Sequence, residues 1–220
     1  AHNRKDSRMT NTPAMNRYSW YGKLPSAGDF LQRRFPDTLQ RQWSHWFQVG
    51  LLAWQQEEQR SGERQFHKAP VWNFVVPPML GSQMIQMGCL LPGRDSVGRQ
   101  YPVCLQLSFA PSEWSTSLLS QAESWYQQIG RLGLHAVRNS FSASQLDEML
   151  MTIPAPQPVE PQKRSDILDV IGYDEDGQNT LGWPQAAECF DPLRQTSYWW
   201  TNRCDGYPLY THVHSGNFTG

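Results

Sequence analysis

Apolar residues in segment 35–59 recur at intervals of three and four positions, which is the spacing of one face of an α-helix. Pro36 and Asp37 suit the first turn, because proline loses no helical hydrogen bond there and a carboxylate faces the positive end of the helix dipole. The pattern predicts a helix that begins near Pro36 and buries one aromatic-rich face. That face holds Leu39, Trp43, Trp46, Phe47, Gly50, Leu51 and Trp54.

Later segments show the same periodicity. Residues 112–137 predict a long helix, and residues 142–153 predict a shorter one in which Ser144 and Asp147 resemble a capping box. Residues 164–172 and 183–190 predict two short helices. The common face of the long helix holds Trp114, Leu118, Leu119, Ala122, Trp125, Ile129 and Leu132.

Short apolar runs bounded by turn residues predict strands. Pro102 indicates that its run begins at an edge or unpaired, since proline has no N–H for a sheet ladder. Short turns join the middle strands, so we expect an α+β fold, a single-domain sandwich of a mainly antiparallel sheet of about five or six strands with packed helices. The runs span residues 19–24, 71–76, 84–91, 101–109, 196–201 and 207–214.

The chain has 220 residues, which fits one domain. Residues 1–16 are polar and nearly free of large apolar groups, and they predict a disordered tail. Residues 17–220 then form the domain. Within it, residues 154–162 contain four prolines and predict an extended loop without helix or strand.

Charge and cysteine content narrow the class of protein. Lysine plus arginine number 19 against 20 acidic residues, a net charge of -1, which argues against a nucleic-acid partner. None of Cys89, Cys104, Cys189 and Cys204 lies in a C-x-x-C pair or at zinc-finger spacing from a histidine. No leader pattern is present, and no apolar run approaches the roughly 18 residues of a membrane helix. We therefore expect a reduced, cytoplasmic protein without a membrane span.

Two glycine-containing stretches invite a comparison with phosphate-binding loops. In YGKLPSAGDF, residues 21–30, the glycines are too far apart and Asp29 stands where the loop needs lysine. In GRDSVGRQ, residues 93–100, Gly93 and Gly98 have the right spacing, but arginine replaces the lysine and glutamine the magnesium-binding hydroxyl. That loop also leads into a strand rather than a helix. We predict a glycine-rich hairpin turn there.

Metal sites and catalytic motifs are weakly supported. His212 and His214 alternate on a predicted strand and share a face, but no acidic residue or cysteine stands at a supporting position. We interpret them as two exposed histidines. His45 borders the apolar face of the first helix, and His67 and His135 lie in no recognisable context.

No G-x-S-x-G elbow or reactive-cysteine pattern occurs. Residues 174–176, Asp-Glu-Asp, lie between glycines and predict a solvated turn. We expect no cofactor, no metal and no enzymatic activity.

Charged residues beside glycines remain as candidates for a site. A lysine or arginine opposite an aspartate would form an internal ion pair that pins the first turn against the hairpin loop. The same residues would equally serve as a surface patch for another protein, and both interpretations stay open. The set is Lys23, Asp29, Arg33, Arg34, Arg94, Asp95 and Arg99.

Several motifs in this order resemble the TagF family, specifically its N-terminal domain, an accessory component of bacterial type VI secretion systems. They are W-Y-G-K-L-P-S-A-G-D-F-L-x-R at 20–33, W-x-x-W-F at 43–47, A-P-V-W-N-F at 69–74, D-S-V-G-R-Q-Y-P at 95–102 and S-Y-W-W-T at 197–201. The chain departs from the family at Ser96, where members often carry a second basic residue.

The resemblance implies a cytoplasmic, non-enzymatic regulator that holds back assembly or firing of the secretion apparatus after translation. The implied direct partner is the forkhead-associated scaffold protein, Fha, of a threonine-phosphorylation pathway. A PppA-type phosphatase and a threonine kinase are implied functional links, and we expect no attached phosphatase domain within the 220 residues. The alternative is an enzyme or a nucleotide- or phosphate-binding protein that uses Lys23, Asp29, Arg94 and Arg99.

Overall fold

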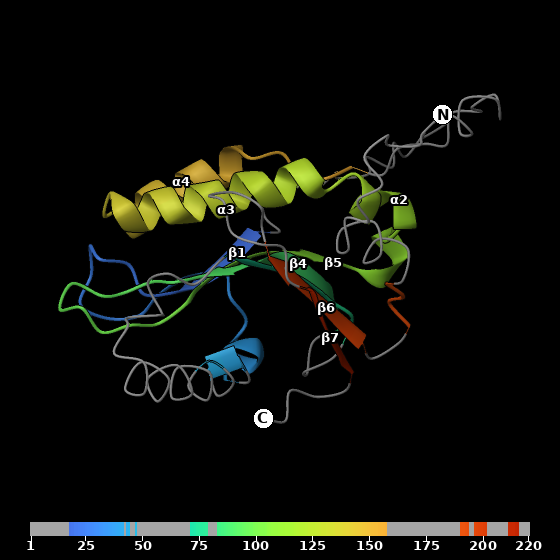
Figure 1. The fold of residues 1–220 in the computed structure, drawn as a ribbon, viewed down its shortest axis with the longest axis horizontal. Coiled ribbons are helices and arrows are strands. Elements are labelled where there is room, and N and C mark those ends of the chain that lie inside the picture. Colours follow the sequence, from blue (N-terminus) through green and yellow to red (C-terminus); the bar gives the residue numbers. More distant parts are fainter. Residues whose placement is uncertain are drawn as a thin grey trace, which may run out of the picture.

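An antiparallel β-sheet forms the middle layer of the molecule (Figure 1). The computed structural model describes residues 18–41, 43, 44, 47, 71–78, 83–157, 190–193, 196–201 and 211–215. Within them the sheet has seven strands in the order β2-β1-β5-β4-β3-β6-β7. The strands are β1 (Tyr18–Gly22), β2 (Leu31–Arg33), β3 (Trp72–Val76), β4 (Ile85–Leu91), β5 (Val103–Phe109), β6 (Thr196–Thr201) and β7 (Thr211–Ser215).

This architecture confirms the predicted α+β class and its antiparallel sheet, since every adjacent pair of strands runs antiparallel. The sheet is one strand larger than the upper expectation. The additional strand, β2, has only three residues, and its sequence Leu-Gln-Arg carries too short an apolar pattern to predict a strand. It forms because the chain turns back after β1 and pairs with it.

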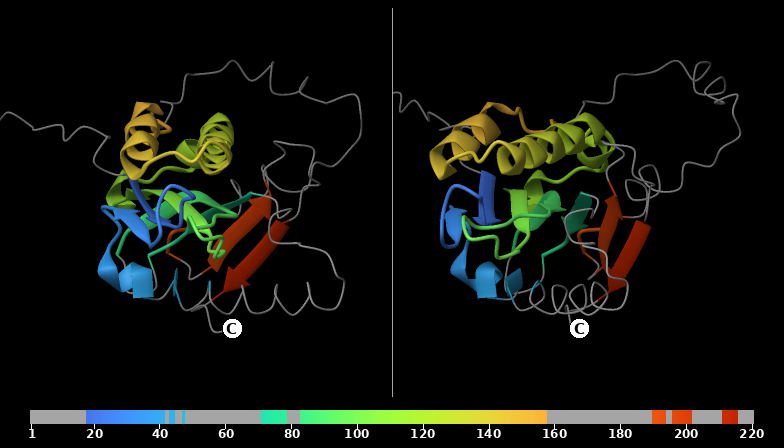
Figure 2. Two further views of the ribbon diagram at one scale, coloured as in Figure 1. Left: turned by 90° about the vertical axis from the view of Figure 1, so that its left-hand side faces the viewer. Right: turned by 60° about the vertical axis from the view of Figure 1, so that its left-hand side comes forward.

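Helices cover both faces of the sheet (Figure 2). On one face lie α3 (Glu123–Arg138) and α4 (Ala143–Thr152), and on the other lies the helix that includes residues 37–41, 43, 44 and 47. All seven residues of β4 are buried as a result. Burial on both faces explains why the central strands appear in the sequence as continuous apolar runs rather than as an alternation.

Two separate apolar cores lie on the two faces. The core under α3 and α4 takes alternate residues of β4 and β5 and the buried side of α3, as expected for strands whose side chains alternate between faces. The core on the opposite face is aromatic and confirms that the first helix buries an apolar face. Its buried members are Tyr21, Phe35, Leu39, Trp43, Phe47, Phe74, Val76, Leu90, Tyr101, Cys104 and Trp199.

The segment predicted as one helix over residues 112–137 is three shorter elements. A 3₁₀ turn (Pro111–Glu113) and α2 (Thr116–Ser120) precede α3. The backbone of Gln121 and Ala122 departs from helical geometry between α2 and α3, so the chain changes direction while Leu118, Leu119 and Ala122 stay in the core. Periodicity alone cannot see such a break, because the apolar spacing continues across it.

The capping box of α4 is placed differently from the prediction. Ser142, not Ser144, is the N-cap residue, and its hydroxyl accepts from the Gln145 N–H at 3.2 Å while the Gln145 side chain accepts from the Ser142 N–H at 2.9 Å. Both Ser-x-x-Gln and Ser-x-x-Asp fit the motif, and the helix begins at the earlier one. Asp147 therefore does not cap the helix, and its carboxylate instead pairs with Arg34.

Other strand predictions hold where the structure describes them. β6 has the predicted bounds, β5 begins after Pro102, and residues 211–214 of the last run lie in β7. The remaining predictions lie outside the described residues. They concern residues 1–16, Trp46 and the first helix beyond residue 47, residues 158–189 including the acidic turn at 174–176, the start of the run 207–214, and His45, His67, Cys189 and Cys204.

Candidate functional site: the junction of two loops

Two loops far apart in the sequence lie side by side at one end of the sheet (Figure 1). They are residues 23–30, which follow β1, and residues 92–100, which precede β5; together we call them the loop junction. Because β1 and β5 are antiparallel neighbours, the chain leaving β1 meets the chain entering β5. The Ser96 N–H donates to the Ala27 carbonyl at 2.8 Å and joins the two loops directly.

Asp95 lies at the centre of the junction and is 1% exposed. Its Oδ1 accepts from the backbone N–H of Val97 at 3.1 Å and of Arg99 at 2.9 Å. Its Oδ2 accepts from Lys23 Nζ at 3.2 Å and from Arg99 Nε at 2.7 Å. These four hydrogen bonds occupy the acceptor positions of an ionised carboxylate and tie the hairpin to the opening loop.

The charge state of Asp95 follows from these contacts. Burial alone would raise the pKa of its carboxyl, but the hydrogen bonds from Arg99, Lys23 and Val97 outweigh that effect and lower the pKa to about 2. The carboxylate is therefore ionised at neutral pH. It has neither a proton to give nor an unused acceptor position, which suits a structural ion pair and does not suit a general acid or base.

The hairpin itself is a tight turn, as its sequence predicts. The Asp95 carbonyl accepts from the Gly98 N–H at 3.0 Å, and Gly98 has φ 86°, a backbone region that glycine adopts without strain. In a phosphate loop, backbone N–H groups point at an anion. Here the N–H groups of Val97 and Arg99 point at the carboxylate of Asp95, which occupies that position from within the chain.

Of the two interpretations left open for the charged set, Asp29 does not take part in the internal ion pair. It is exposed, and its Oδ1 accepts from the backbone N–H of the adjacent Phe30 at 2.7 Å. The residue that pairs with lysine and arginine inside the junction is Asp95 instead. Both aspartates stand beside glycine-rich turns, and only the pairing of β1 with β5 decides which one meets Lys23.

Arg33 and Arg94 lie outside the ion cluster. The guanidinium of Arg33 lies 5.8 Å from the ring centre of Trp20, and its Nη1 donates to the Gln32 carbonyl. Arg94 forms an isolated bridge with Gln100 and is half-buried. Alternation along the hairpin places Arg94 on the face opposite to Asp95.

Arg34 forms a second ion pair, with a residue that sequence reasoning assigned to a helix cap. Its Nη2 donates to Asp147 Oδ1 at 2.5 Å and its Nη1 to Asp147 Oδ2 at 3.2 Å, while Trp20 Nε1 donates to the same carboxylate at 3.0 Å. Burial would raise the pKa of Asp147, but the hydrogen bonds from Arg34 and Trp20 lower it below its usual range. This fork anchors the start of the sheet to α4, and no local sequence signal marks a pair separated by 113 positions.

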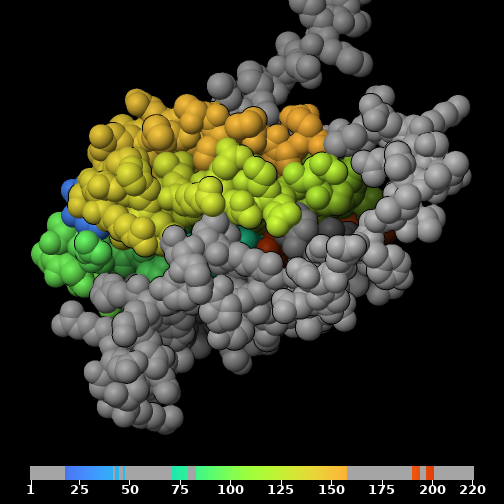
Figure 3. All heavy atoms as spheres, turned by 45° about the horizontal axis from the view of Figure 1, so that its top comes forward, coloured from blue at the N-terminus to red at the C-terminus, as the bar shows by residue number. Residues whose placement is uncertain are grey.

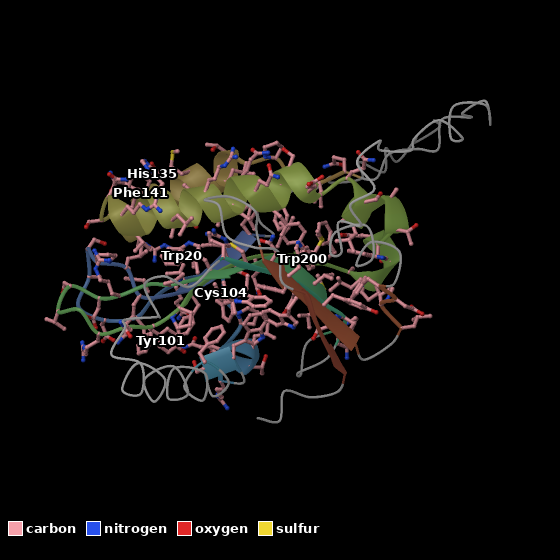
Figure 4. All side chains as sticks on the ribbon, viewed as in Figure 1. Trp20, Tyr101, Cys104, His135, Phe141 and Trp200 are labelled. Carbon is pink, nitrogen blue, oxygen red and sulfur yellow. The ribbon has the colours of Figure 1, made fainter. Side chains whose placement is uncertain are left out.

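An aromatic side chain is part of the junction surface. The ring of Phe30 stacks on Tyr21 at 5.5 Å, meets Tyr101 edge-on at 4.7 Å and carries Lys23 Nζ at 4.7 Å from its centre. Phe30 is nevertheless 43% exposed. Its ring thus combines solvent exposure with contacts to two members of the aromatic core, Tyr21 and Tyr101, of which Figure 4 labels Tyr101.

The histidine and cysteine candidates show no assembled site. No group of three metal-ligating side chains occurs within the described part of the chain. His212 and His214 hold alternate positions of β7, opposite Trp199 and Ser197. His135 is exposed on α3 and meets Phe141 edge-on, as Figure 4 labels. Cys89 and Cys104 are buried free thiols, and burial raises the pKa of both.

Comparison with known proteins identifies the family. Residues 19–153, more than half of the chain, match the family described as TagF N-terminal domain, Type VI secretion system-associated. The chain belongs to this TagF family. The match covers the two loops of the junction, the Lys23–Asp95 and Arg34–Asp147 ion pairs, and α4.

A solved structure shares the TagF chain's fold. The crystal structure of PA0076 from Pseudomonas aeruginosa PAO1 superimposes with a TM-score of 0.64 at 21% sequence identity, covering 89% of this chain and 87% of that one. No curated protein matches the sequence. None of the helices in the described residues has the length and apolar character to cross a membrane.

Proposed function

We propose that this chain is a post-translational negative regulator of type VI secretion, which holds back assembly or firing of the apparatus in the cytoplasm. It acts by binding the forkhead-associated scaffold protein of the threonine-phosphorylation pathway, with functional links to a PppA-type phosphatase and a threonine kinase. The observation that carries this proposal is the family match over residues 19–153.

The geometry of the loop junction supports a binding role over a catalytic one. Its central carboxylate is ionised and fully hydrogen-bonded, and the amides of its glycine-rich hairpin are used by Asp95. A nucleotide-binding or acid–base function at Lys23, Asp29, Arg94 and Arg99 would need some of these groups available for a ligand. The junction instead has the properties of a rigid frame that presents side chains to a partner.

A secretion assay tests the regulatory part of the proposal. Overproduction of the protein should lower the amount of an apparatus component exported to the medium while its transcript and total cellular amount stay unchanged, and deletion should raise export. Unchanged export in both strains would contradict repression. Lower export accompanied by a lower transcript would move the effect from the assembled apparatus to gene expression.

Co-purification tests the partner. The protein, produced with the complete secretion cluster, should retain the forkhead-associated scaffold on an affinity column. Calorimetric titration with nucleotides and phosphorylated peptides serves as the matched measurement for the alternative function. If the protein binds a nucleotide and retains no scaffold, the regulator would be rejected in favour of the nucleotide-binding alternative.

A further inference from the structure

The loop junction exposes side chains that its internal contacts do not use. Val97, at the tip of the hairpin, is 72% exposed, the side chain of Arg99 is 62% exposed, and Phe30 is 43% exposed. Phe30 and Val97 are two of the five large apolar side chains exposed among the described residues. Exposed apolar groups that gather beside charges mark interaction surfaces.

Contacts through the junction bring together the segments that carry these three side chains. Arg99 Nη2 donates to the Gly28 carbonyl at 2.8 Å, two residues before Phe30. Lys23 lies over the Phe30 ring and bonds the same carboxylate as Arg99. Val97 follows Ser96, whose N–H is bonded to the opening loop. The hairpin, green in Figure 3, forms one end of the face shown there.

The charge of this surface differs in sign from that of the whole chain. Residues 23–30 and 92–100 carry three basic side chains against two acidic ones, a net charge of +1, whereas the complete chain carries -1. The rest of the molecule is therefore net acidic. A partner with an acidic segment is attracted to the loop junction and repelled elsewhere, which orients the encounter.

We infer that Phe30, Val97 and Arg99 form the docking surface for an acidic segment of a protein partner, one that also carries an apolar side chain. The apolar side chain packs on Phe30 and Val97, and a carboxylate pairs with the outward part of the Arg99 guanidinium. That guanidinium is held in place by Asp95 and Gly28, so little side-chain freedom is lost on binding. Apolar groups at the centre favour a protein over a nucleic acid as the occupant.

Val97 gives a sharp test because its side chain can change without touching the ion cluster. Only its backbone N–H bonds Asp95. Val97→Glu and Val97→Lys both replace the exposed apolar side chain by a charged one, and Arg131→Glu makes a charge change at an exposed position in the middle of α3. If the partner segment is acidic, Val97→Glu weakens binding by about fivefold or more, and Arg131→Glu has no effect. Val97→Lys weakens binding less than Val97→Glu does, because its positive charge offsets the lost apolar contact.

The first measurement uses the forkhead-associated scaffold as the binding partner, so in this form the inference rests on the proposed function. If Val97→Glu and Val97→Lys weaken scaffold binding equally, Val97 makes only an apolar contact. That result would overturn the inference that the partner segment is acidic. Wild-type affinity in both variants would remove the docking surface while leaving the proposed function intact. If the wild-type protein does not bind the scaffold, the proposed partner is refuted. The docking surface is then tested by the second measurement alone.

The second measurement is independent of the scaffold. ¹⁵N-labelled protein is titrated with an octapeptide of alternating glutamate and leucine, with the lysine–leucine peptide and inorganic phosphate as controls. Amide signals of Phe30, Val97 and Arg99 should shift with the acidic peptide alone. No shift at millimolar acidic peptide overturns the inference, and equal shifts with phosphate reassign the surface to small anions.

Discussion

The close approach of the two loops depends on the absence of a side chain at Gly93. An ideal Cβ built there lies 2.6 Å from the Lys23 carbonyl oxygen and 2.7 Å from the Tyr101 carbonyl oxygen, and real Cβ atoms do not approach that closely. Both neighbours are backbone atoms of segments held in place by β1 and β5. Gly93→Ala therefore requires the loops to separate by about 0.8 Å to reach ordinary contact at 3.4 Å.

Over-packing of this kind costs about 1–3 kcal/mol. In a chain of this size each kcal/mol lowers the melting temperature by about 2–4 °C, so Gly93→Ala should melt roughly 2–12 °C below the wild type. Thermal and urea unfolding followed by tryptophan fluorescence measure the change. The Ser96 amide, bonded to Ala27 across the junction, should also exchange its hydrogen faster.

Gly98 in the same hairpin provides the matched control, because it is required for a different reason. Its φ is 86° and nothing lies within 4 Å of a Cβ placed there. Gly98→Ala should destabilise the protein through backbone strain. Gly98→Asn should retain most of the wild-type stability, because asparagine tolerates the left-handed backbone region. At Gly93 asparagine should be worse than alanine. A Gly93→Ala protein that melts within 1 °C of the wild type would refute the close packing of the loops.

Three further predictions follow from buried groups. The folded-state pKa of Asp95 is about 2, below its ordinary 3.8, so the stability that the carboxylate contributes is present above about pH 4 and lost as pH falls toward 2. Asp95→Asn should therefore flatten the plot of unfolding free energy against pH in that window. A plot for the variant that runs parallel to that of the wild type would contradict the ion cluster. The Tyr18 hydroxyl accepts from Trp125 and donates to a carbonyl at the end of α4, both at 2.8 Å, so Tyr18→Phe should lower the free energy of unfolding by about 1–3 kcal/mol in urea titration. Cys89 and Cys104 should resist iodoacetamide in the native protein and react in urea, as peptide mass spectrometry would show; native labelling would contradict their burial.

The sequence contains enough information for the elements but not for their long-range pairing. Apolar runs between turn residues predict β3 to β6 within a few residues, because burial of the sheet on both faces makes these runs continuous. β2 is missed because three residues hold no period, and the break before α3 is missed because the apolar spacing continues through it. Each failure concerns geometry that tertiary contacts impose on a locally ambiguous stretch.

The same limit governs the candidate site. The sequence leaves open an ion pair between a lysine or arginine and an aspartate where the first turn faces the hairpin, beside a surface patch for a partner. Lys23 and Asp95 form such a pair across 72 positions. The sequence cannot choose between Asp29 and Asp95, because that choice depends on the register of β1 against β5. Nor can it find Arg34 with Asp147, since an ion pair between a strand end and a helix leaves no spacing in the sequence.

The structure separates two roles that the motif residues share in the sequence. Asp95 receives four hydrogen bonds from Lys23, Arg99 and Val97, so its carboxylate has no acceptor position left for a partner, and Lys23 is 7% exposed. Asp95 and Lys23 hold the loops together and are too buried to contact another protein. In the proposed docking surface, the contacts therefore come from the side chains that the frame presents, which are Phe30, Val97 and the outward part of Arg99. A rigid frame would strengthen such binding, because little order remains to be gained.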